Sequence, residues 1–434
     1  MHSKKYLSFP ALRGHLTECF NDVEDMRDAS KVDYSMHDCL MSGFAMMFFQ
    51  DPSILQFQES LQKYYRSNNL RTVFKVSNIP KETQMRDVID NVPSESITPV
   101  FKEFFKHLQR GKHLEQYEFL SGKYLVSIDA SGYFSSSKVS CPNCLEKNAG
   151  SKTKKTTYSH MILQSVMMHP DMKQVLPLVP EEIVKQDGSV KQDCELNAGK
   201  RLLKELRRVH PKLGLIIVGD GLYSKQPFIA DLTGHGMSYI LVAKHTDHKI
   251  LKEQVEEASL LGTISRKEYV DEKGRTHIYE WKNSLDLNGN KKSVAVNHFE
   301  YWLVNGGKTT YHNSWVTDIP LDEHNIEKMV RGGRSRWKIE NETFNTLKNQ
   351  GYHLEHNFGH GKNHLSYNFF LLNLLAFFVH QISELTDTLY QKTRGEFTSR
   401  REFWNQLRCT FRILLFDSWE SFLLKIFDPV GQPP

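Results

Sequence analysis

The chain has little cysteine, no apolar segment at its start, no internal repeat and no low-complexity tract. Only six of its 434 residues are cysteines, and most of these stand alone in the sequence. Such sparse cysteine does not build a disulfide framework and is typical of a reducing compartment. Because no apolar segment follows Met1, no secretory signal is predicted. We therefore expect a cytoplasmic protein.

A hydrophobic run long enough to span a bilayer is also lacking. The most apolar segment, 368–382, contains Asn373 and His380. It is shorter than the roughly 20 residues that a membrane helix needs. We expect a buried helix there, and no membrane partner.

What remains is the composition of an ordinary globular protein. Hydrophobic residues make up 39% of the chain and charged residues 25%. The net charge of +5 permits an acidic partner such as nucleic acid but does not require one. A chain of 434 residues exceeds the usual size of a single core, so two or three domains are expected.

Residues 1–120 are predicted to form a helical domain. The segment 37–49 is almost wholly apolar and fits the inner helix of a small bundle. Basic residues surround it, as in a duplex-binding domain, although solvated helix faces look the same. This basic set is Arg66, Arg71, Lys75, Lys81, Arg86, Lys102, Lys106, Arg110 and Lys112.

Residues 121–248 are predicted to form the first part of a mixed sheet with covering helices. Asp129 directly follows the strand pattern of 124–128, and Asp220 follows the apolar run 213–219. Ligands of such sheets collect where strands end. The other expected elements are strands at 158–168, 175–179 and 239–243, and helices at 194–209 and 226–232.

Short alternating runs make 249–318 a β-rich insertion. Helical patterns return in 319–385, which we expect to complete the core, and continue in a C-terminal helical segment, 386–434. The expected strands of the insertion are 264–269, 276–281, 293–299, 301–304 and 309–317, and the final amphipathic segment is 403–427.

The pattern of 335–350 predicts a helix that stops at Gly351. At about 100° per residue, Arg336 and Glu340 share one face, whereas Glu342 points about 200° away from Glu340. Lys348 lies two turns beyond Glu340, roughly 12 Å along the axis. Taken alone, the segment is equally typical of a solvated helix with i,i+4 ion pairs.

Asp129, Asp220 and Glu340 together fit a two-cation site for phosphoryl transfer. Mg²⁺ and Mn²⁺ prefer oxygen ligands, and a pair of such ions activates a hydroxyl and stabilises a leaving oxygen. Each aspartate taken singly could be an ordinary turn acid. Glu342 is the alternative third acid, and Arg336 makes Glu340 the stronger candidate because it shares the face of Glu340.

This arrangement resembles the bacterial insertion-sequence transposases of the DDE type, in the group with a Tyr-Arg-Glu-Lys signature. The resemblance covers the chain from Lys123 to the apolar segment 368–382. It is carried by Asp129, Val218-Gly219-Asp220-Gly221-Leu222-Tyr223, the β-rich insertion, Arg336-Trp337-Lys338-Ile339-Glu340, Lys348, and the runs 341–351 and 356–361.

The resemblance implies an α/β fold with an RNase H-like mixed sheet interrupted by the β-rich insertion. It implies Mg²⁺ or Mn²⁺ as the cofactor, held by the three acids, and contacts to DNA from Arg336, Lys348 and Tyr223. Two departures stand out. The signature tyrosine is replaced by Gly333, and the gap from Glu340 to Lys348 is longer than the pattern by about one residue.

Members of the group also hold a flipped base with an aromatic side chain from the insertion. Trp315 is the first candidate for this role, and Trp302 is the second. A tryptophan packed in the sheet core is an equally good interpretation of either residue.

Cys141 and Cys144 form half of a possible Zn²⁺ site, which His160 and His169 could complete. The alternative is a β-turn that carries two thiols. A second histidine cluster has spacings unlike a tetrahedral site, so we expect hydrogen bonding at a helix end or DNA contact from it. This cluster is His353, His356, His360 and His364.

The sequence therefore predicts a transposase that moves an insertion sequence by cut-and-paste. Its expected partners are double-stranded DNA, as inverted terminal repeats and as target, and a second copy of itself in a synaptic complex on the bacterial nucleoid. The alternatives are a catalytically inactive DNA-binding descendant of a transposase and an RNase H-like DNA nuclease.

Overall fold

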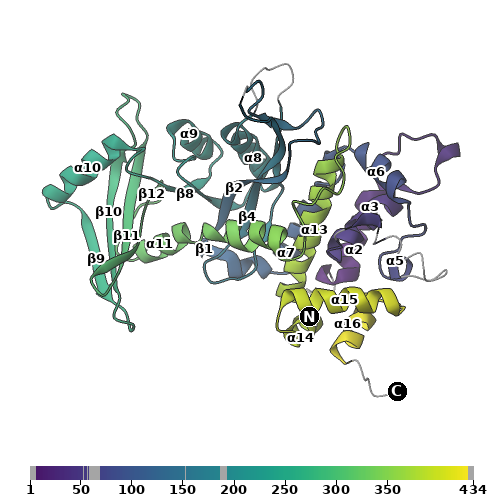
Figure 1. The fold of residues 1–434 in the computed structure, drawn as a ribbon. Helices are drawn as coiled ribbons and strands as arrows, with labels where there is room; N and C mark the ends of the chain where they lie inside the picture. The colour runs from purple at the N-terminus through teal and green to yellow at the C-terminus, as the bar shows by residue number, and fades with distance from the viewer. Residues whose placement is uncertain are drawn as a thin grey trace.

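The structure is a computed structural model that describes residues 6–51, 53–55, 57, 69–151, 153–185 and 193–428. The molecule is elongated, with a helical body at one end, a sheet flanked by helices in the middle and the β-rich insertion at the other end (Figure 1). Arg66 lies outside the described residues.

The helical body is built around α3 (Met36–Phe48), which is buried along almost its whole length. This confirms the predicted inner helix. Against it pack α2 (Phe9–Asn21), α6 (Glu82–Asp90) and a helix from the far end of the chain, α13 (Leu365–Thr386). The body also contains α5 (Asn69–Thr72) and α7 (Pro99–Arg110). The first and last thirds of the sequence thus share one hydrophobic core.

Helix α13 is longer than the predicted segment 368–382 because polar residues at both its ends continue the helix. By length and composition alone it could cross a membrane, but 83% of its most apolar stretch is buried inside the protein. Within the described residues, α13 is therefore placed as a core helix of the helical body.

Asp90, the last residue of α6, connects that helix to the start of α13. Its carboxylate accepts hydrogen bonds from the backbone N–H groups of Lys362, Asn363, His364 and Leu365, at 2.8–3.1 Å. These N–H groups belong to the turn that begins α13 and to its first residue, where a helix leaves amides without internal partners. The carboxylate satisfies them and its charge suits the positive end of the helix dipole.

A 12-stranded mixed sheet extends from the middle of the molecule into the insertion. Nine of its strands follow the order β3-β4-β2-β7-β8-β12-β11-β10-β9, while β1 pairs with β2, and β5 and β6 pair with β4, off this path. Strand β2 (Lys123–Ser136) pairs in parallel with β7 (Gly214–Gly219), which pairs in parallel with β8 (Ser238–Val242). Strand β4 (Thr157–Met168) is antiparallel to β2. The covering helices are α8 (Glu195–Val209) and α9 (Gln226–Gly234), and the short strands are β1 (Glu118–Leu120), β3 (Leu145–Lys147), β5 (Leu176–Pro177) and β6 (Glu181–Ile183).

Strand β2 does not end before Asp129 as its sequence pattern predicts. It runs on to Ser136 because β4 pairs with it from Leu125 to the end, with a bulge after Gly132. Its other neighbour, β7, pairs only as far as Ser127. Asp129 therefore lies just past the end of the parallel pairing rather than at the end of a strand.

The insertion adds an antiparallel meander to the same sheet. Its strands are β9 (Ser265–Val270), β10 (Thr276–Asp286), β11 (Ala295–Asn305) and β12 (Lys308–Thr317). The runs 293–299 and 301–304, predicted as two strands, form the single strand β11. A helix that the pattern analysis missed, α10 (Lys249–Leu260), precedes the meander. Because β12 pairs with β8, the insertion extends the core sheet.

The C-terminal segment also differs from its prediction. Residues 403–427 form two helices, α15 (Arg400–Ile413) and α16 (Trp419–Phe427), after the short α14 (Thr388–Gly395). The side chain of Asn69 fixes the break between α15 and α16, since its amide donates to the carbonyls of Phe411 and Leu414. These helices close the helical body from below (Figure 1).

Candidate active site

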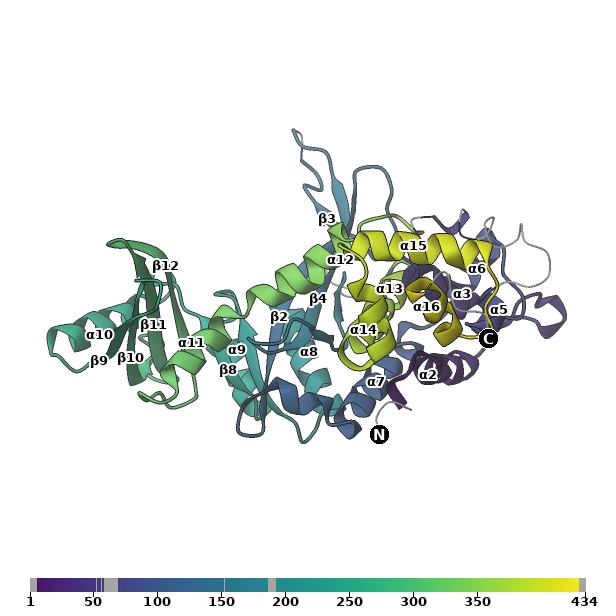
Figure 2. The same ribbon diagram turned by 90° about the horizontal axis from the view of Figure 1, so that it is seen from below.

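A run of helix crosses the sheet diagonally and carries the predicted third acid (Figure 2). It comprises α11 (Ile326–Arg334), a turn at residues 335–336, a π-helix η4 (Ile339–Asn345) and α12 (Thr346–Asn349). The prediction of one regular helix from Ser335 is therefore wrong in detail. Trp337 is 45% exposed, whereas Phe344 and Leu347 are buried, so the three do not share one buried stripe.

Arg336 joins the first and third predicted acids. Its Nη1 lies 2.7 Å from Oε1 of Glu340, one turn on, and 3.9 Å from Oδ2 of Asp129 on β2. The shared face of Arg336 and Glu340 is thus confirmed. The guanidinium thus links Glu340, on η4, to Asp129, on β2.

Asp220 completes the group electrostatically. It follows β7, the strand beside β2, and its negative charge contributes to raising the pKa of the Asp129 carboxyl. Burial is the main cause of that shift, which brings the pKa to about 7; Arg336 opposes it, and Glu340 also adds to it. The site therefore holds more negative charge than its single arginine neutralises.

Glu195, the first residue of α8, is a further member that the sequence analysis missed. It raises the pKa of Asp129, and its own pKa is raised by burial and by the charge of Asp220. The hydroxyl of Tyr223 donates a hydrogen bond to Glu195. Its position at the start of an amphipathic helix resembles an ordinary helix-capping acid, so only the spatial arrangement could reveal it.

The structure corrects the predicted role of Tyr223 in DNA contact. Its side chain is fully buried and packs over Gly219, where an added Cβ would lie 2.8 Å from the ring. Its hydroxyl is committed to Glu195. Tyr223 therefore positions an acid of the site and has no surface to offer DNA in this structure.

Trp315 is corrected in the same way. Its strand is paired on both sides, Phe299 stacks on it at 5.2 Å, and its side chain is 0% exposed. Gly333 packs against the ring: an added Cβ would lie 2.7 Å from Nε1. The buried indole thus explains why no tyrosine stands at position 333. Trp302, the second candidate, is half-buried and stacks on His312.

The π-helix η4 accounts for the unusual spacing between Glu340 and Lys348. A π-helix accommodates one extra residue within a helical turn. In a regular α-helix, eight steps rotate the side chain by about 80° beyond two full turns, whereas seven steps return it to within about 20°. Because η4 absorbs the extra residue, Lys348 stays near the face of Glu340, where its Nζ pairs with Glu355 at 2.9 Å.

Glu342, the alternative third acid, lies elsewhere on η4. Its charge acts on Lys338, whose pKa burial lowers and Glu342 raises. Asp129, by contrast, is influenced by Glu340. Among the two acids of η4, Glu340 is therefore the one that faces the site.

The structure also assembles Cys141, Cys144 and His160, with sulfur-to-Nε2 distances of 3.3 and 3.5 Å. The fourth member is His360, not His169, which faces Phe119. The sequence spacing of His360 predicts no role in a tetrahedral site; the fold overrides that linear spacing. His364 of the same histidine cluster lies at the N-cap of α13, while His353 and His356 have pKa values lowered by burial.

A second group that could hold a metal ion lies where the core sheet meets the insertion. His245, Glu300 and His312 have their ligand atoms within 4.8 Å of one another. The imidazole of His245 contacts the Glu300 carboxylate directly. A hydrogen bond accounts for this contact without a metal.

Comparison with known families identifies the family of the chain. A family model described as a transposase DDE domain matches residues 128–378, more than half of the chain. The chain belongs to the DDE transposase family. The match begins one residue before Asp129 and includes Asp220 and Glu340, so the transposase domain contains the acids that the structure brings together. No curated protein matches the chain.

The family match agrees with the mixed α/β architecture of the transposase, with its large mixed sheet and many helices. Members of this family bind DNA and use divalent metal ions. This transposase also has features that follow only from its own residues: Gly333 beneath Trp315, the π-helix η4, and Glu195 beside Asp220.

Proposed function

We propose that this protein is an active cut-and-paste transposase that uses Mg²⁺ or Mn²⁺ held by Asp129, Asp220 and Glu340 on an RNase H-like core. The observation that carries the proposal is the position of Arg336, within 2.7 Å of Glu340 and 3.9 Å of Asp129. Strand β2, the end of β7 and the helix run, which are far apart in the sequence, supply these acids and the arginine that pairs with two of them.

The donor set supports divalent metal ions of the hard class. All the acids offer carboxylate oxygens, which Mg²⁺ and Mn²⁺ prefer. Burial, and then the charges of Glu340, Glu195 and Asp220, raise the pKa of Asp129 to about 7. When bound, such ions activate an attacking hydroxyl and stabilise the leaving oxygen. Glu195 supports the same site by adding negative charge beside Asp220.

In the proposed reaction, water attacks the phosphodiester at an element end and releases a 3′-hydroxyl. That hydroxyl then attacks a phosphodiester of the target DNA, joining the end and releasing a target 3′-hydroxyl. In this proposal Arg336, whose guanidinium lies beside Glu340 and Asp129, binds the phosphate next to the scissile bond. Lys348 contacts the next phosphates along the strand in the same proposal.

Trp337 is the accessible aromatic beside this arginine, with 45% of its surface exposed. Since Trp315 is buried, we propose Trp337, with Trp302 as the alternative, for stacking on an unpaired base. The indole ring of Trp337 also lies beneath Nζ of Lys338, at 5.3 Å.

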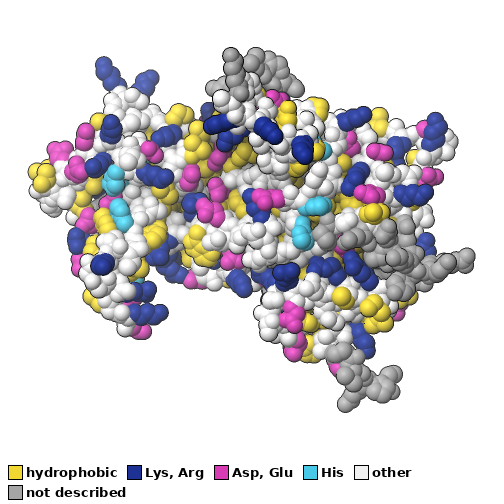
Figure 3. Space-filling view, in the orientation of Figure 1, with side chains coloured by type: hydrophobic (Ala, Val, Ile, Leu, Met, Phe, Trp, Pro, Cys, Tyr) yellow, Lys and Arg dark blue, Asp and Glu magenta, His cyan; other side chains and the backbone are white. Residues whose placement is uncertain are grey.

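The proposed DNA partners are the terminal repeats and the target, bound by a homodimer in a synaptic complex in the cytoplasm. The exposed basic residues of the helical body include Arg71, Lys75, Lys81, Arg110 and Lys112. Basic and acidic side chains are mixed on the face in Figure 3.

The test uses the DNA that flanks the reading frame, placed on a plasmid. With Mg²⁺, the wild-type protein is expected to nick that DNA and join its ends to a second plasmid, whereas Asp220→Ala binds the DNA without cutting it. Binding without nicking by the wild-type protein would favour an inactive descendant. Nicking without joining would favour a nuclease, and either result would overturn the proposal.

A further inference from the structure

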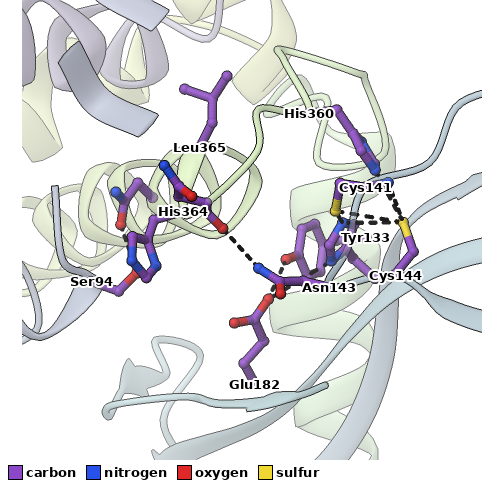
Figure 4. A network of polar contacts seen from close by, with 12 residues as sticks. Ser94, Tyr133, Cys141, Asn143, Cys144, Glu182, His360, His364 and Leu365 are labelled. Atoms are coloured by element: carbon purple, nitrogen blue, oxygen red, sulfur yellow. Dashed lines mark hydrogen bonds and ion pairs between the residues drawn. The ribbon is translucent and has the colours of Figure 1, made fainter. Parts of the chain in front are cut away.

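A second cluster of ligand-type side chains lies outside the carboxylate site. Cys141 and Cys144 flank a turn before β3, His160 comes from β4, and His360 comes from the loop after α12. The ligand atoms of all four lie within 4.8 Å of one another. Figure 4 shows His360 reaching from its loop toward the two sulfur atoms.

The distances match the edges of a tetrahedron around zinc. Zinc bonds of about 2.3 Å to sulfur and about 2.0 Å to nitrogen give edges of about 3.8 Å between sulfurs and about 3.5 Å between sulfur and nitrogen. The two sulfurs are 3.8 Å apart. Nε2 of His160 lies 3.3 and 3.5 Å from them, and Nε2 of His360 lies 3.1 Å from the Cys144 sulfur.

The surroundings are those of a closed site. Cys144 is 0% exposed and His160 is 2% exposed, and aromatic rings of Tyr133 and Phe134 face the two imidazoles. Both imidazoles direct Nε2 at sulfur, while Nδ1 of His160 lies 3.8 Å from a carboxylate oxygen of Glu182. A carboxylate behind the histidine is the usual outer partner of a zinc ligand.

A disulfide does not explain the cluster, because a sulfur–sulfur bond is about 2.05 Å long and the two sulfurs are 3.8 Å apart. A network of thiol and imidazole hydrogen bonds gives no reason for four groups from three segments to converge on one point.

We propose that Cys141, Cys144, His160 and His360 bind one structural zinc ion. Two thiolates and two imidazoles form a common zinc donor set, and four protein ligands fill a tetrahedral shell without leaving a position for water. The ion is therefore structural rather than catalytic. This inference does not depend on the proposed transposition reaction.

The zinc ion would cross-link the β3–β4 region to the loop after α12. His160 and His360 are far apart in the sequence, and a link that closes so long a loop removes much freedom from the unfolded chain. Beside the site, the amide of Asn143 donates to the carbonyl of Asn363 at 2.8 Å. The loop after α12 is thereby held to β4 at one point and to Asp90 at the next.

The first measurement is the metal content of the full-length protein purified without chelator. We expect about one zinc per chain. Cobalt substitution should give absorption from thiolate-to-metal charge transfer and from a tetrahedral ion. Cys144→Ser and His360→Ala should lose zinc. The matched controls should keep it: Cys409→Ser changes a thiol on α15, and His356→Ala changes a histidine in the same loop as His360. His169→Ala should also keep it.

His360→Cys separates loss of a ligand from loss of folding. Three cysteines and one histidine also bind zinc, so this variant should retain the metal, and its cobalt charge-transfer band should grow by about half because thiolates rise from two to three. Zinc-free wild-type protein, zinc retained by His360→Ala, or zinc lost from both His360 variants would each overturn the proposal.

Discussion

The acid cluster and the cysteine–histidine cluster of this molecule differ in their donor atoms and in their exposure to solvent. The acid cluster offers carboxylate oxygens beside a sheet edge, and Glu340 is half exposed; the cysteine–histidine cluster offers sulfur and nitrogen, and its Cys144 and His160 are buried. Each takes its last member from the same stretch of chain, Glu340 in one case and His360 in the other. Donor type and openness, rather than position in the fold, therefore distinguish a site for reaction from a site for stability.

The largest expected effect separates the two clusters by function. Glu340→Gln should lower DNA cleavage by at least about 1,000-fold, because it removes a charged ligand of the catalytic ions. Its zinc content should stay that of the wild-type protein. Cleavage by gel assay and zinc by elemental analysis give the two readouts. Cleavage that survives in Glu340→Gln would remove this residue from the site.

The next effect is a pH dependence confined to the acid cluster. Burial, with the charges of Glu340, Glu195 and Asp220, raises the pKa of Asp129 to about 7. An unfolded aspartate has a pKa of about 3.9, so between these values the folded chain binds more protons and its free energy of unfolding falls as pH rises. Mg²⁺ needs the ionised carboxylate, so its affinity should rise up to tenfold per pH unit below about 7 and level off above.

Thermal unfolding without Mg²⁺ checks the sign. Asp129→Asn should stabilise the protein by about 4 kcal/mol at pH 8 and by little at pH 4, because it removes an ionised carboxylate only where one exists. Glu253→Gln, which changes an exposed acid on α10, should show no such pH dependence. Equal stabilisation at both pH values would contradict the assignment.

A smaller effect is expected where the helix run meets the insertion. Gly333→Ala places a Cβ 2.7 Å from Nε1 of the fully buried Trp315, which has no room to move. We expect the free energy of unfolding to fall by about 1–3 kcal/mol. The affinity of the acid cluster for Mg²⁺ should also fall, while the zinc content should stay the same. Gly395→Ala on α14, where an added Cβ meets no described atom within 4 Å, should be close to neutral in denaturant unfolding.

The smallest effect concerns the π-helix. Deletion of the exposed Asn341 should convert η4 into regular α-helix and keep Lys348 near the face of Glu340, changing stability by less than about 1 kcal/mol and cleavage only a few-fold. Insertion of an alanine after Asn341 should rotate Lys348 by about 100° and weaken DNA binding. If the deletion is the more damaging change in band-shift and cleavage assays, η4 does not hold the lysine in phase.

Local patterns predicted the elements that local patterns control. The strands around Asp129 and Asp220, the helix α8 and the inner helix α3 follow from periodicity, and so does the shared face of Arg336 and Glu340. The family match then showed the transposase domain that the resemblance had suggested. The length of β2 was not predictable, because it depends on pairing with a strand that lies later in the chain.

The errors in the site have the same origin. Residue type and spacing do not predict the surroundings of Trp315, Tyr223 and His360, because partners from other segments decide them. Glu195 was overlooked because nothing next to it in the sequence distinguishes it from a helix-capping acid. The two departures from the family pattern have physical causes in the structure. Gly333 packs against the ring of Trp315, and η4 accommodates the longer spacing after Glu340.

The carboxylate of Asp90 has a practical consequence for dividing this protein into pieces. A fragment that begins at residue 121 would contain every acid of the family match, yet it would leave the first amides of α13 without their acceptor. The apolar sides of α13 that face α2, α3 and α6 would become exposed to water. Such a fragment is expected to aggregate, and co-expression with residues 1–120 as a separate chain is expected to restore its solubility.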